Sequence, residues 1–269
     1  MTLLKPIDPS QRPSLSDEEA APPPEIRGAK RVDRETDELL ERLEKLAAAL
    51  HAEGRRSLLV VLQARDGGGK DGTIRKVFGA VNPQGMHLAS FAAPAGEELR
   101  HDYLWRVHRV TPEYGQVGVF NRSHYEDVLV ARVRGFAAPE QWEKRYDQIN
   151  DFERMLHENG TTILKFFLHI SKGEQKSRLL KRLNRPEKRW KFAPSDLEDR
   201  ALWDEYTVAY QDALTRCSTP YAPWYVVPAD EKPVRDFLVA QVVVDALEKM
   251  APQIPEADPT VMAMADRIV

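Results

Sequence analysis

Apolar residues recur with two different periods along the chain. Between Asp33 and Leu50, the residues Leu39, Leu43, Leu46 and Leu50 stand at helical spacing, which predicts an amphipathic helix ahead of the main domain. After this segment, short apolar runs rich in β-branched or aromatic residues alternate with helical patterns. Such alternation is typical of βα units, so we expect an α/β fold with a mostly parallel central sheet.

The expected elements and boundaries follow from these runs. Strands are predicted over residues 57–62, 87–91, 116–120, 162–170 and 224–227. Helices are predicted over residues 72–81, 97–108, 123–133, 139–157, 172–184, 196–216 and 234–250. Nine of the nineteen prolines stand at the two ends of the chain, six of them before residue 25 and three after residue 250. We therefore expect a proline-rich N-terminal strap over 1–30, a main domain over 31–250 and a C-terminal tail over 251–269.

The composition excludes several classes of protein. With 269 residues, 42% hydrophobic and 30% charged, the chain can bury a sizeable core, which excludes a mainly disordered protein. Apolar runs such as residues 58–62 are far shorter than the ~20 residues that cross a bilayer, and the N-terminus lacks a signal pattern. The single cysteine, Cys217, has no partner for a disulfide or a zinc site. We expect a cytoplasmic protein with no membrane partner.

The charge is distributed very unevenly, although the net charge is only −3. Residues 165–191 contain ten basic and two acidic residues, a charge of +8, which leaves −11 for the rest of the chain. A segment of this kind is often only a solvated face, but its density favours a polyanionic partner such as nucleic acid or a phosphate chain.

A glycine-rich loop follows the first predicted strand. The sequence Asp66-Gly-Gly-Gly-Lys70-Asp-Gly-Thr73 joins this strand to a helix, which is the context that a phosphate-binding loop requires. The loop backbone would turn its N–H groups toward phosphate oxygens, and Lys70 would reach the phosphoryl group that is transferred. The expected phosphate-binding positions, besides Lys70, are Gly67, Gly68, Gly69, Asp71, Gly72 and Thr73. The alternative is a glycine-rich surface turn.

Two residues depart from the usual phosphate-loop pattern. Ala64 replaces its first glycine, and Asp71 replaces the hydroxyl residue that normally contacts magnesium after the lysine. Asp66 is the nearest carboxylate that could hold the metal instead, because hard oxygen ligands suit Mg²⁺. Otherwise Asp66 would accept hydrogen bonds from the loop N–H groups.

The third predicted strand ends in a run of polar residues, Asn121-Arg122-Ser123-His124-Tyr125-Glu126-Asp127. The carboxyl edge of a parallel sheet is where ligands bind, so we expect Arg122 to clamp a phosphate. Asn121 stands where such enzymes usually carry an aspartate, and the negative charge must come from Glu126 or Asp127. Glu126 has a structural alternative, because Ser123-x-x-Glu126 is a capping-box pattern.

The basic segment also has a helical pattern. Along one helix face, Arg178, Lys181, Arg182 and Arg185 stand at i, i+3, i+4 and i+7. The opposite face, with Leu179, Leu180 and Leu183, is expected to be buried. Residues 185–192 then form a basic loop with Lys191, Trp190 and Phe192, the last two being expected anchors. A basic loop over a phosphate site is the usual form of a lid.

Four of these segments together resemble the second family of polyphosphate kinases over roughly residues 30–250. They are Asp66-Gly-Gly-Gly-Lys70-Asp-Gly-Thr73, Asn82-Pro-Gln-Gly85, Phe120-Asn-Arg-Ser-His-Tyr-Glu-Asp127 and Lys188-Arg-Trp-Lys-Phe192. The resemblance implies a P-loop kinase-like three-layer sandwich with an N-terminal helical extension. It makes residues 31–250 the catalytic domain, with a helical lid at about 178–200. It also implies Mg²⁺-dependent phosphoryl transfer between inorganic polyphosphate and adenine nucleotides, and Asn121-Arg122-Ser123 resembles the class III branch, which accepts AMP and ADP.

The resemblance implies roles for individual residues as well. The catalytic positions would be Asp66, Lys70, Arg122, Asp127 and Arg182, with Asp66 and Asp127 holding the metal. Polyphosphate would be bound by Arg178, Lys181, Arg185 and Lys191, and Asn121 and Glu126 would face the nucleotide acceptor. We also expect a homo-oligomer.

Two other functions share parts of this pattern. An ATP-dependent nucleoside monophosphate kinase would have the same fold but no need of a long basic stripe. A nucleic-acid-binding P-loop protein would use the stripe, yet would interleave aromatic residues for base stacking. Residues 172–189 contain no aromatic residue, so we expect no nucleic-acid partner.

Overall fold

A five-stranded parallel sheet forms the centre of the computed structural model, which describes residues 3–26, 29–262, 264 and 268. The strands are β1 (Ser57–Gln63), β2 (Met86–Ser90), β3 (Val117–Asn121), β4 (Thr161–His169) and β5 (Trp224–Pro228). Their order across the sheet is β2-β3-β1-β4-β5, and every neighbouring pair is parallel. The predicted α/β class is therefore confirmed, with strand boundaries that differ from the prediction by one residue or less.

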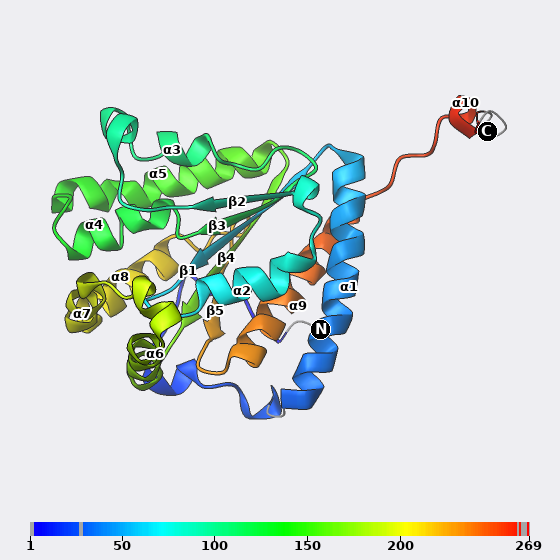
Figure 1. Cartoon of the computed structure of the whole chain (residues 1–269). Helices are drawn as coiled ribbons and strands as arrows, with labels where there is room; N and C mark the ends of the chain where they lie inside the picture. The colour runs from blue at the N-terminus through cyan, green and yellow to red at the C-terminus, as the bar shows by residue number, and fades with distance from the viewer. Residues whose placement is uncertain (1–2, 27–28, 263, 265–267, 269) are drawn as a thin grey trace.

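Helices cover both faces of the sheet and make three layers (Figure 1). One face packs against α1 (Ala29–Glu53), α2 (Lys70–Val77) and α9 (Lys232–Met250). The other packs against α5 (Pro139–Glu158) and α8 (Trp203–Arg216). Side chains of β1 alternate between these two cores, because successive residues of a strand point to opposite faces. All seven residues of β1 are buried, which explains its uninterrupted apolar run.

Four further helices lie around the sandwich, and a fifth, α10 (Pro259–Met262), lies away from it (Figure 1). The four are α3 (Trp105–His108), α4 (Val130–Val133), α6 (Lys172–Asn184) and α7 (Pro194–Ala201). Short 3₁₀ turns connect them: η1 (Asp17–Ala20), η2 (Pro24–Ile26), η3 (Phe78–Ala80), η4 (Pro83–Gly85), η5 (Gly96–Arg100), η6 (His124–Asp127) and η7 (Pro186–Lys191). Among the described helices, none is long and apolar enough to cross a membrane.

Three predicted helices are wrong as continuous helices. The segment 97–108 is broken because the Asp102 carboxylate accepts the N–H groups of Leu104 and Trp105, which starts a new helix there. The segment 123–133 is interrupted at Leu129, whose φ of −103° and ψ of −83° are not helical. The segment 196–216 divides into α7 and α8 at Leu202, where ψ is +31°. Apolar periodicity gives no information about such breaks, because they depend on single side-chain hydrogen bonds and backbone angles.

The N-terminal segment lies along the last strand of the sheet. The Ile7 N–H donates to the Trp224 carbonyl oxygen at 2.8 Å, and Leu15 is only 5% exposed. Ala20 accepts a hydrogen bond from the Asp230 N–H at 3.1 Å. At the other end, the chain leaves the body of the molecule after α9 (Figure 1).

A charged cluster is completely buried between β4, α5 and η6. Lys165 and Glu153 form an ion pair with 0% side-chain exposure on both sides. The Lys165 ammonium also donates to the Tyr125 hydroxyl at 2.8 Å and to the Cys217 carbonyl oxygen at 2.7 Å. Burial alone would raise the pKa of Glu153, but Lys165 and His124 hold it below its usual value. The pair anchors the segment that carries Tyr125 to the strand beneath it.

Breaking this pair should destabilise the protein. We expect Lys165→Met to lower the free energy of unfolding by about 3–5 kcal/mol, because the Glu153 carboxylate stays buried without its counter-ion. The double variant Lys165→Met/Glu153→Gln should lose less. Urea unfolding at pH 7 measures both. The control is Arg154→Met, which breaks the exposed Arg154–Asp151 pair and should cost less than about 1 kcal/mol. Equal losses in Lys165→Met and Arg154→Met would contradict the prediction.

Candidate functional site

The glycine-rich loop lies between the carboxyl end of β1 and the first turn of α2. Its backbone takes left-handed conformations at Gly67 (φ +80°) and Gly69 (φ +105°), which glycine adopts without steric cost. Lys70 opens α2, and its Nζ donates to the Ala64 carbonyl oxygen at 2.9 Å across the loop. Burial lowers the pKa of Lys70, and the nearby Arg122 charge lowers it further. An anion bound in the loop would place a negative charge beside Lys70 and would raise its pKa again.

Arg122 connects two carboxylates at the end of β3. Its guanidinium lies 3.2 Å from Asp66 and 3.5 Å from Glu126. The Arg122 backbone has a φ of +62°, although the residue is not glycine. This conformation costs of order 1 kcal/mol and is found where function requires it. The sheet holds it, because the Arg122 N–H donates to the Leu62 carbonyl oxygen at 3.1 Å.

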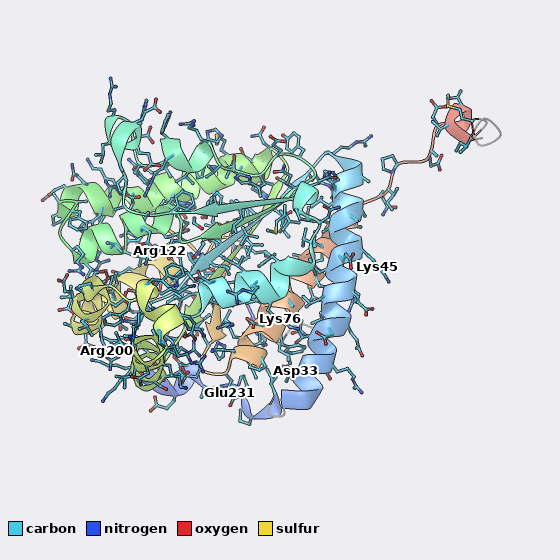
Figure 2. The ribbon with its side chains drawn as sticks, in the orientation of Figure 1. Asp33, Lys45, Lys76, Arg122, Arg200 and Glu231 are labelled. Carbon is cyan, nitrogen blue, oxygen red and sulfur yellow. The ribbon has the colours of Figure 1, made fainter. Side chains whose placement is uncertain are left out.

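The strand register brings these groups together. Leu62 of β1 pairs with Asn121 of β3 and with Phe166 of β4, so the chain leaves all three strands at one edge of the sheet. Arg122 lies at this end of the molecule, where α6, α7 and α8 also gather (Figure 2). Four predicted site residues therefore meet here: Asp66, Lys70, Arg122 and Glu126.

A small cavity of about 40 Å³ opens beside this group. Asp66, Arg122 and Glu126 are among its charged lining residues. Its apolar and aromatic lining residues are Leu129, Val130, Trp203, Tyr206 and Tyr210. Charged groups and aromatic rings therefore meet at this position, a combination typical of ligand sites.

Several residues of this cavity cannot be recognised from the sequence pattern. Arg65 lies with its guanidinium 3.8 Å from the Trp203 ring centre, and burial lowers its pKa to about 10. Its Nη1 donates to the Trp203 carbonyl oxygen at 2.8 Å. Tyr206 and Tyr210 stand one helical turn apart on α8, but nothing local distinguishes them from core residues. Only the packing of α8 over the loop identifies them.

Glu126 and Asp127 face different arginines. The Asp127 carboxylate pairs with Arg145 at 3.3 Å, and Arg145 also donates to the Asp127 carbonyl oxygen. The proposed capping box is absent, because the Ser123 hydroxyl accepts the Tyr125 N–H at 3.1 Å. This leaves the Glu126 carboxylate facing Arg122, and its burial raises its pKa. The metal role of Asp127 stays a prediction, and the turn makes the preceding carboxylate, Glu126, a second candidate because it lies beside Arg122.

The donor set at this position suits a hard cation. Asp66 and Glu126 both approach the same Arg122 side chain, and carboxylate oxygens are the ligands that Mg²⁺ prefers. Gln63 lies near Glu126, and its buried Oε1 has no hydrogen-bond partner in the part of the chain that the structure describes. Within that same part, no group of three or more acidic, His or Cys side chains could hold a metal by protein ligands alone. Any metal here would therefore share its coordination with a bound phosphate or water.

Arg178 does not extend toward a substrate as the sequence pattern indicated. It is 8% exposed, and its Nη1 donates to the carbonyl oxygens of Gly67 at 3.0 Å and Gly68 at 3.3 Å. Its Nη2 donates to the carbonyl oxygens of Ala229 and Asp230, and its Nε to Glu174. The phosphate-binding role expected for Arg178 is therefore replaced by a structural one, because every nitrogen of its guanidinium is engaged.

The remaining residues of the basic stripe differ among themselves. Lys181 and Arg185 are exposed, whereas Arg182 is half-buried and lies 3.7 Å from Asp196. The prediction that Leu180 and Leu183 are buried is wrong, because α6 lies at the surface and only Leu179 of the three reaches the core. Trp190 is 77% exposed, so it does not anchor the loop.

Two residues expected to bind phosphate contact each other instead. The Lys191 ammonium of η7 lies 2.8 Å from the Asp71 carboxylate of α2, and Asn121 donates to the same carboxylate at 3.1 Å. The Lys191 hydrogen bond holds the pKa of Asp71 below its usual value. This contact joins the basic segment to the glycine-rich loop, so the segment lies over the site.

Comparison with known proteins identifies close relatives. The sequence model described as polyphosphate kinase 2 (PPK2) matches residues 28–255. The AMP/ADP-polyphosphate phosphotransferase of Meiothermus ruber is 58% identical over 217 residues, 81% of each chain. The ADP-polyphosphate phosphotransferase of Rhodopseudomonas palustris is 46% identical over 232 residues, 82% of this chain and 80% of that one. The crystal structure of polyphosphate kinase 2 from Arthrobacter aurescens TC1 superposes with a TM-score of 0.87 at 42% identity, covering 97% and 90% of the two chains.

Metal binding can decide between Glu126 and Asp127 as the metal ligand at the end of β3. With tripolyphosphate present and Mn²⁺ as the probe, we expect Glu126→Gln to weaken Mn²⁺ binding by at least about tenfold, because it removes one of the carboxylates beside the loop. Asp127→Asn should bind Mn²⁺ as the parent does. Electron paramagnetic resonance of free Mn²⁺ measures both. The opposite order of the two variants would return the metal role to Asp127.

Proposed function

The chain belongs to the polyphosphate kinase 2 family and is a polyphosphate-dependent nucleotide phosphotransferase, and we propose that it converts AMP to ADP and ADP to ATP with Mg²⁺. The observation that carries this proposal is the meeting of Lys70, Arg122, Asp66 and Glu126 beneath a basic segment. Phosphoryl transfer asks little covalent chemistry of the protein, and positioning and neutralisation of charge dominate.

We assign the donor phosphate to the glycine-rich loop. The N–H groups at the start of α2 and the Lys70 ammonium would bind the phosphoryl group that moves. Arg122 would neutralise charge on its equatorial oxygens, and this requires Arg122 to exchange part of its contact with Asp66 and Glu126 for phosphate. Those two carboxylates would hold Mg²⁺, which when bound supplies further neutralisation of the phosphate charge. Arg182 would approach from the lid.

We assign the acceptor nucleotide to the cavity mouth beside Arg122. The aromatic rings of Trp203, Tyr206 and Tyr210, which line this cavity, support a nucleoside there. Glu126 and Asn121 would face the acceptor phosphate through the metal or water. The terminal phosphate of AMP or ADP is already anionic at neutral pH, so the reaction needs no strong general base.

The same proposal covers the domain boundaries, the cellular location and the oligomeric state. We propose a strap over 1–30, a catalytic domain over 31–250 with its lid at about 178–200, and a tail over 251–269. We also propose a cytoplasmic homo-oligomer. Neither ATP-dependent nucleotide phosphorylation nor nucleic-acid binding is favoured by the relatives, which are named for polyphosphate.

The proposed phosphorylation of AMP and ADP can be tested directly. Purified protein with AMP, polyphosphate and Mg²⁺ should form ADP and then ATP, measured by chromatography, and chelation of Mg²⁺ should stop the reaction. Lys70→Ala, the matched inactive control, should lose at least about 10²-fold in turnover. Protein that uses ATP to phosphorylate AMP but ignores polyphosphate would contradict the proposal. Competition by RNA at low concentration would instead favour a nucleic-acid function.

The exposed part of the stripe should affect binding more than chemistry. Lys181 and Arg185 lie on α6 and at its end, where they would contact donor phosphates beyond the one transferred. Such contacts bind ground and transition states alike, so Lys181→Ala and Arg185→Ala should raise the KM for polyphosphate several-fold with little change in kcat. Arg182→Ala should lower kcat. Steady-state kinetics with long and short chains measures this.

The salt dependence of the KM for polyphosphate provides a control for the role of Lys181 and Arg185. Exposed charges are screened over a Debye length of ~8 Å at physiological ionic strength, so added salt should raise the KM of the parent more than that of the two variants. Equal KM values for long and short polyphosphate in parent and variants would make α6 a solvated surface without a role in donor binding.

A further inference from the structure

A buried arginine of α9 lies against the glycine-rich loop. Arg235 is 1% exposed, and its Nε and Nη2 lie 2.9 and 2.7 Å from one carboxylate oxygen of Asp236. Its Nη1 is also buried and has no hydrogen-bond partner in the described part of the chain. A buried cationic donor without a partner is costly, so it is seldom retained for stability alone.

The contact with the loop is close. A Cβ atom added at Gly69 would lie 1.9 Å from Arg235 Nη1, and one added at Gly72 would lie 3.2 Å from Nη2. These glycines flank Lys70 on both sides. The loop can therefore approach the guanidinium this closely only because Gly69 has no side chain, and a side chain at Gly72 would fit only tightly. Gly69 and Gly72 therefore leave room for Arg235, and Gly69 also allows the loop to turn.

The same guanidinium is tied to the first turn of α2. The Thr73 hydroxyl donates to the Asp236 oxygen at 3.0 Å, and this is the oxygen that Arg235 contacts. A chain of contacts thus runs from α2 through Asp236 to Arg235 and back to Gly69. Arg235 fixes the loop at the start of the helix whose N–H groups would bind phosphate.

Arg178 supports the loop from the same side. The Cβ position at Gly69 is 3.5 Å from Arg178 Nη1, the atom that holds the Gly68 carbonyl oxygen. The carbonyl and the following N–H of a trans peptide point in opposite directions. Holding the Gly68 carbonyl therefore directs the Gly69 N–H away from Arg178. The guanidinium groups of Arg178 and Arg235 repel each other, yet both lie against the loop.

We propose that Arg235 is a positioning residue of the phosphate loop, which fixes the backbone at Gly69 and Gly72 and places a buried positive charge behind the phosphate of bound polyphosphate. This inference rests on the proposed function, because polyphosphate is the ligand. Arg235 does not contact the reacting atoms. Its effect should appear in the binding of the donor and little in the binding of AMP.

The test measures the binding of tripolyphosphate by isothermal titration calorimetry. Arg235→Met should weaken binding about tenfold, because it removes the charge and the contact with Gly69. Arg235→Lys should recover a large part of the affinity, because it keeps the charge and can pair with Asp236. The KM for polyphosphate should rise in parallel with the loss of affinity, and the KM for AMP should not change.

Two further variants separate this role from stability. Arg235→Met leaves Asp236 without its main counter-ion, so the double variant Arg235→Met/Asp236→Asn removes the pair as a unit and guards against loss of the fold. It should still lose affinity for tripolyphosphate, because the contact with Gly69 stays lost, but less than Arg235→Met, because no unpaired carboxylate remains. Arg56→Met is the matched control, because Arg56 binds the Met250 carbonyl oxygen and Glu53 next to the other end of β1. It should change thermal stability without changing tripolyphosphate affinity.

Salt dependence supplies a readout that a purely structural role would not move. A buried charge is poorly screened, so the ratio of parent to Arg235→Met affinities should persist as salt is added, whereas the ratio for Lys181→Ala should decline. Parent protein that binds tripolyphosphate, with both Arg235 variants binding equally well, would overturn the role of Arg235. Parent protein that does not bind tripolyphosphate would contradict the proposed function itself.

Discussion

The burial of β1 on both faces and along both edges is the constraint on which the site depends. It lies between β3 and β4, and all seven of its residues are buried. Because parallel strands must end at the same edge, the loop after β1, the turn after β3 and the end of β4 all meet there. The apolar contacts of the sheet thus place Asp66 and Arg122 3.2 Å apart, although 55 residues lie between them.

The charges of the site are arranged in pairs that phosphate can rearrange. Arg122 lies between Asp66 and Glu126, Lys191 lies beside Asp71, and Arg182 lies near Asp196. In each pair the carboxylate holds a cation that a phosphate could also bind. Such pairing lowers the cost of collecting many cations at one place before the substrate arrives. The cations behind the loop differ, because Arg178 contacts backbone carbonyls and Arg235 contacts Asp236 and glycine.

Strain and close packing occur at the site. Arg122 adopts a left-handed conformation, and the loop accepts Arg235 at this distance only because Gly69 lacks a side chain. The fully buried pair of Lys165 and Glu153 lies beneath η6 and holds the Tyr125 hydroxyl. The surrounding cores can maintain these unfavourable features because they bury large apolar surfaces on both sides of the sheet.

The sequence by itself determined the strands, the glycine-rich loop and the position of Lys70, because these depend on apolar periodicity and on residues adjacent in the chain. Tertiary structure decided which side chains enter the site. The turn at Arg122 directs Glu126 inward and leaves Asp127 with Arg145, a difference of one residue that no spacing rule resolves. Helical spacing put Arg178 on the same face as Lys181, but carbonyl oxygens from the loop and from Ala229 lie within reach of Arg178 alone. Arg235 and Tyr210 look like interior residues of their helices until packing brings them against the loop and the cavity. The physical reason is that a side chain's partners come from distant segments, and only the packing of α6, α8 and α9 around the sheet determines which of them are close enough to bind.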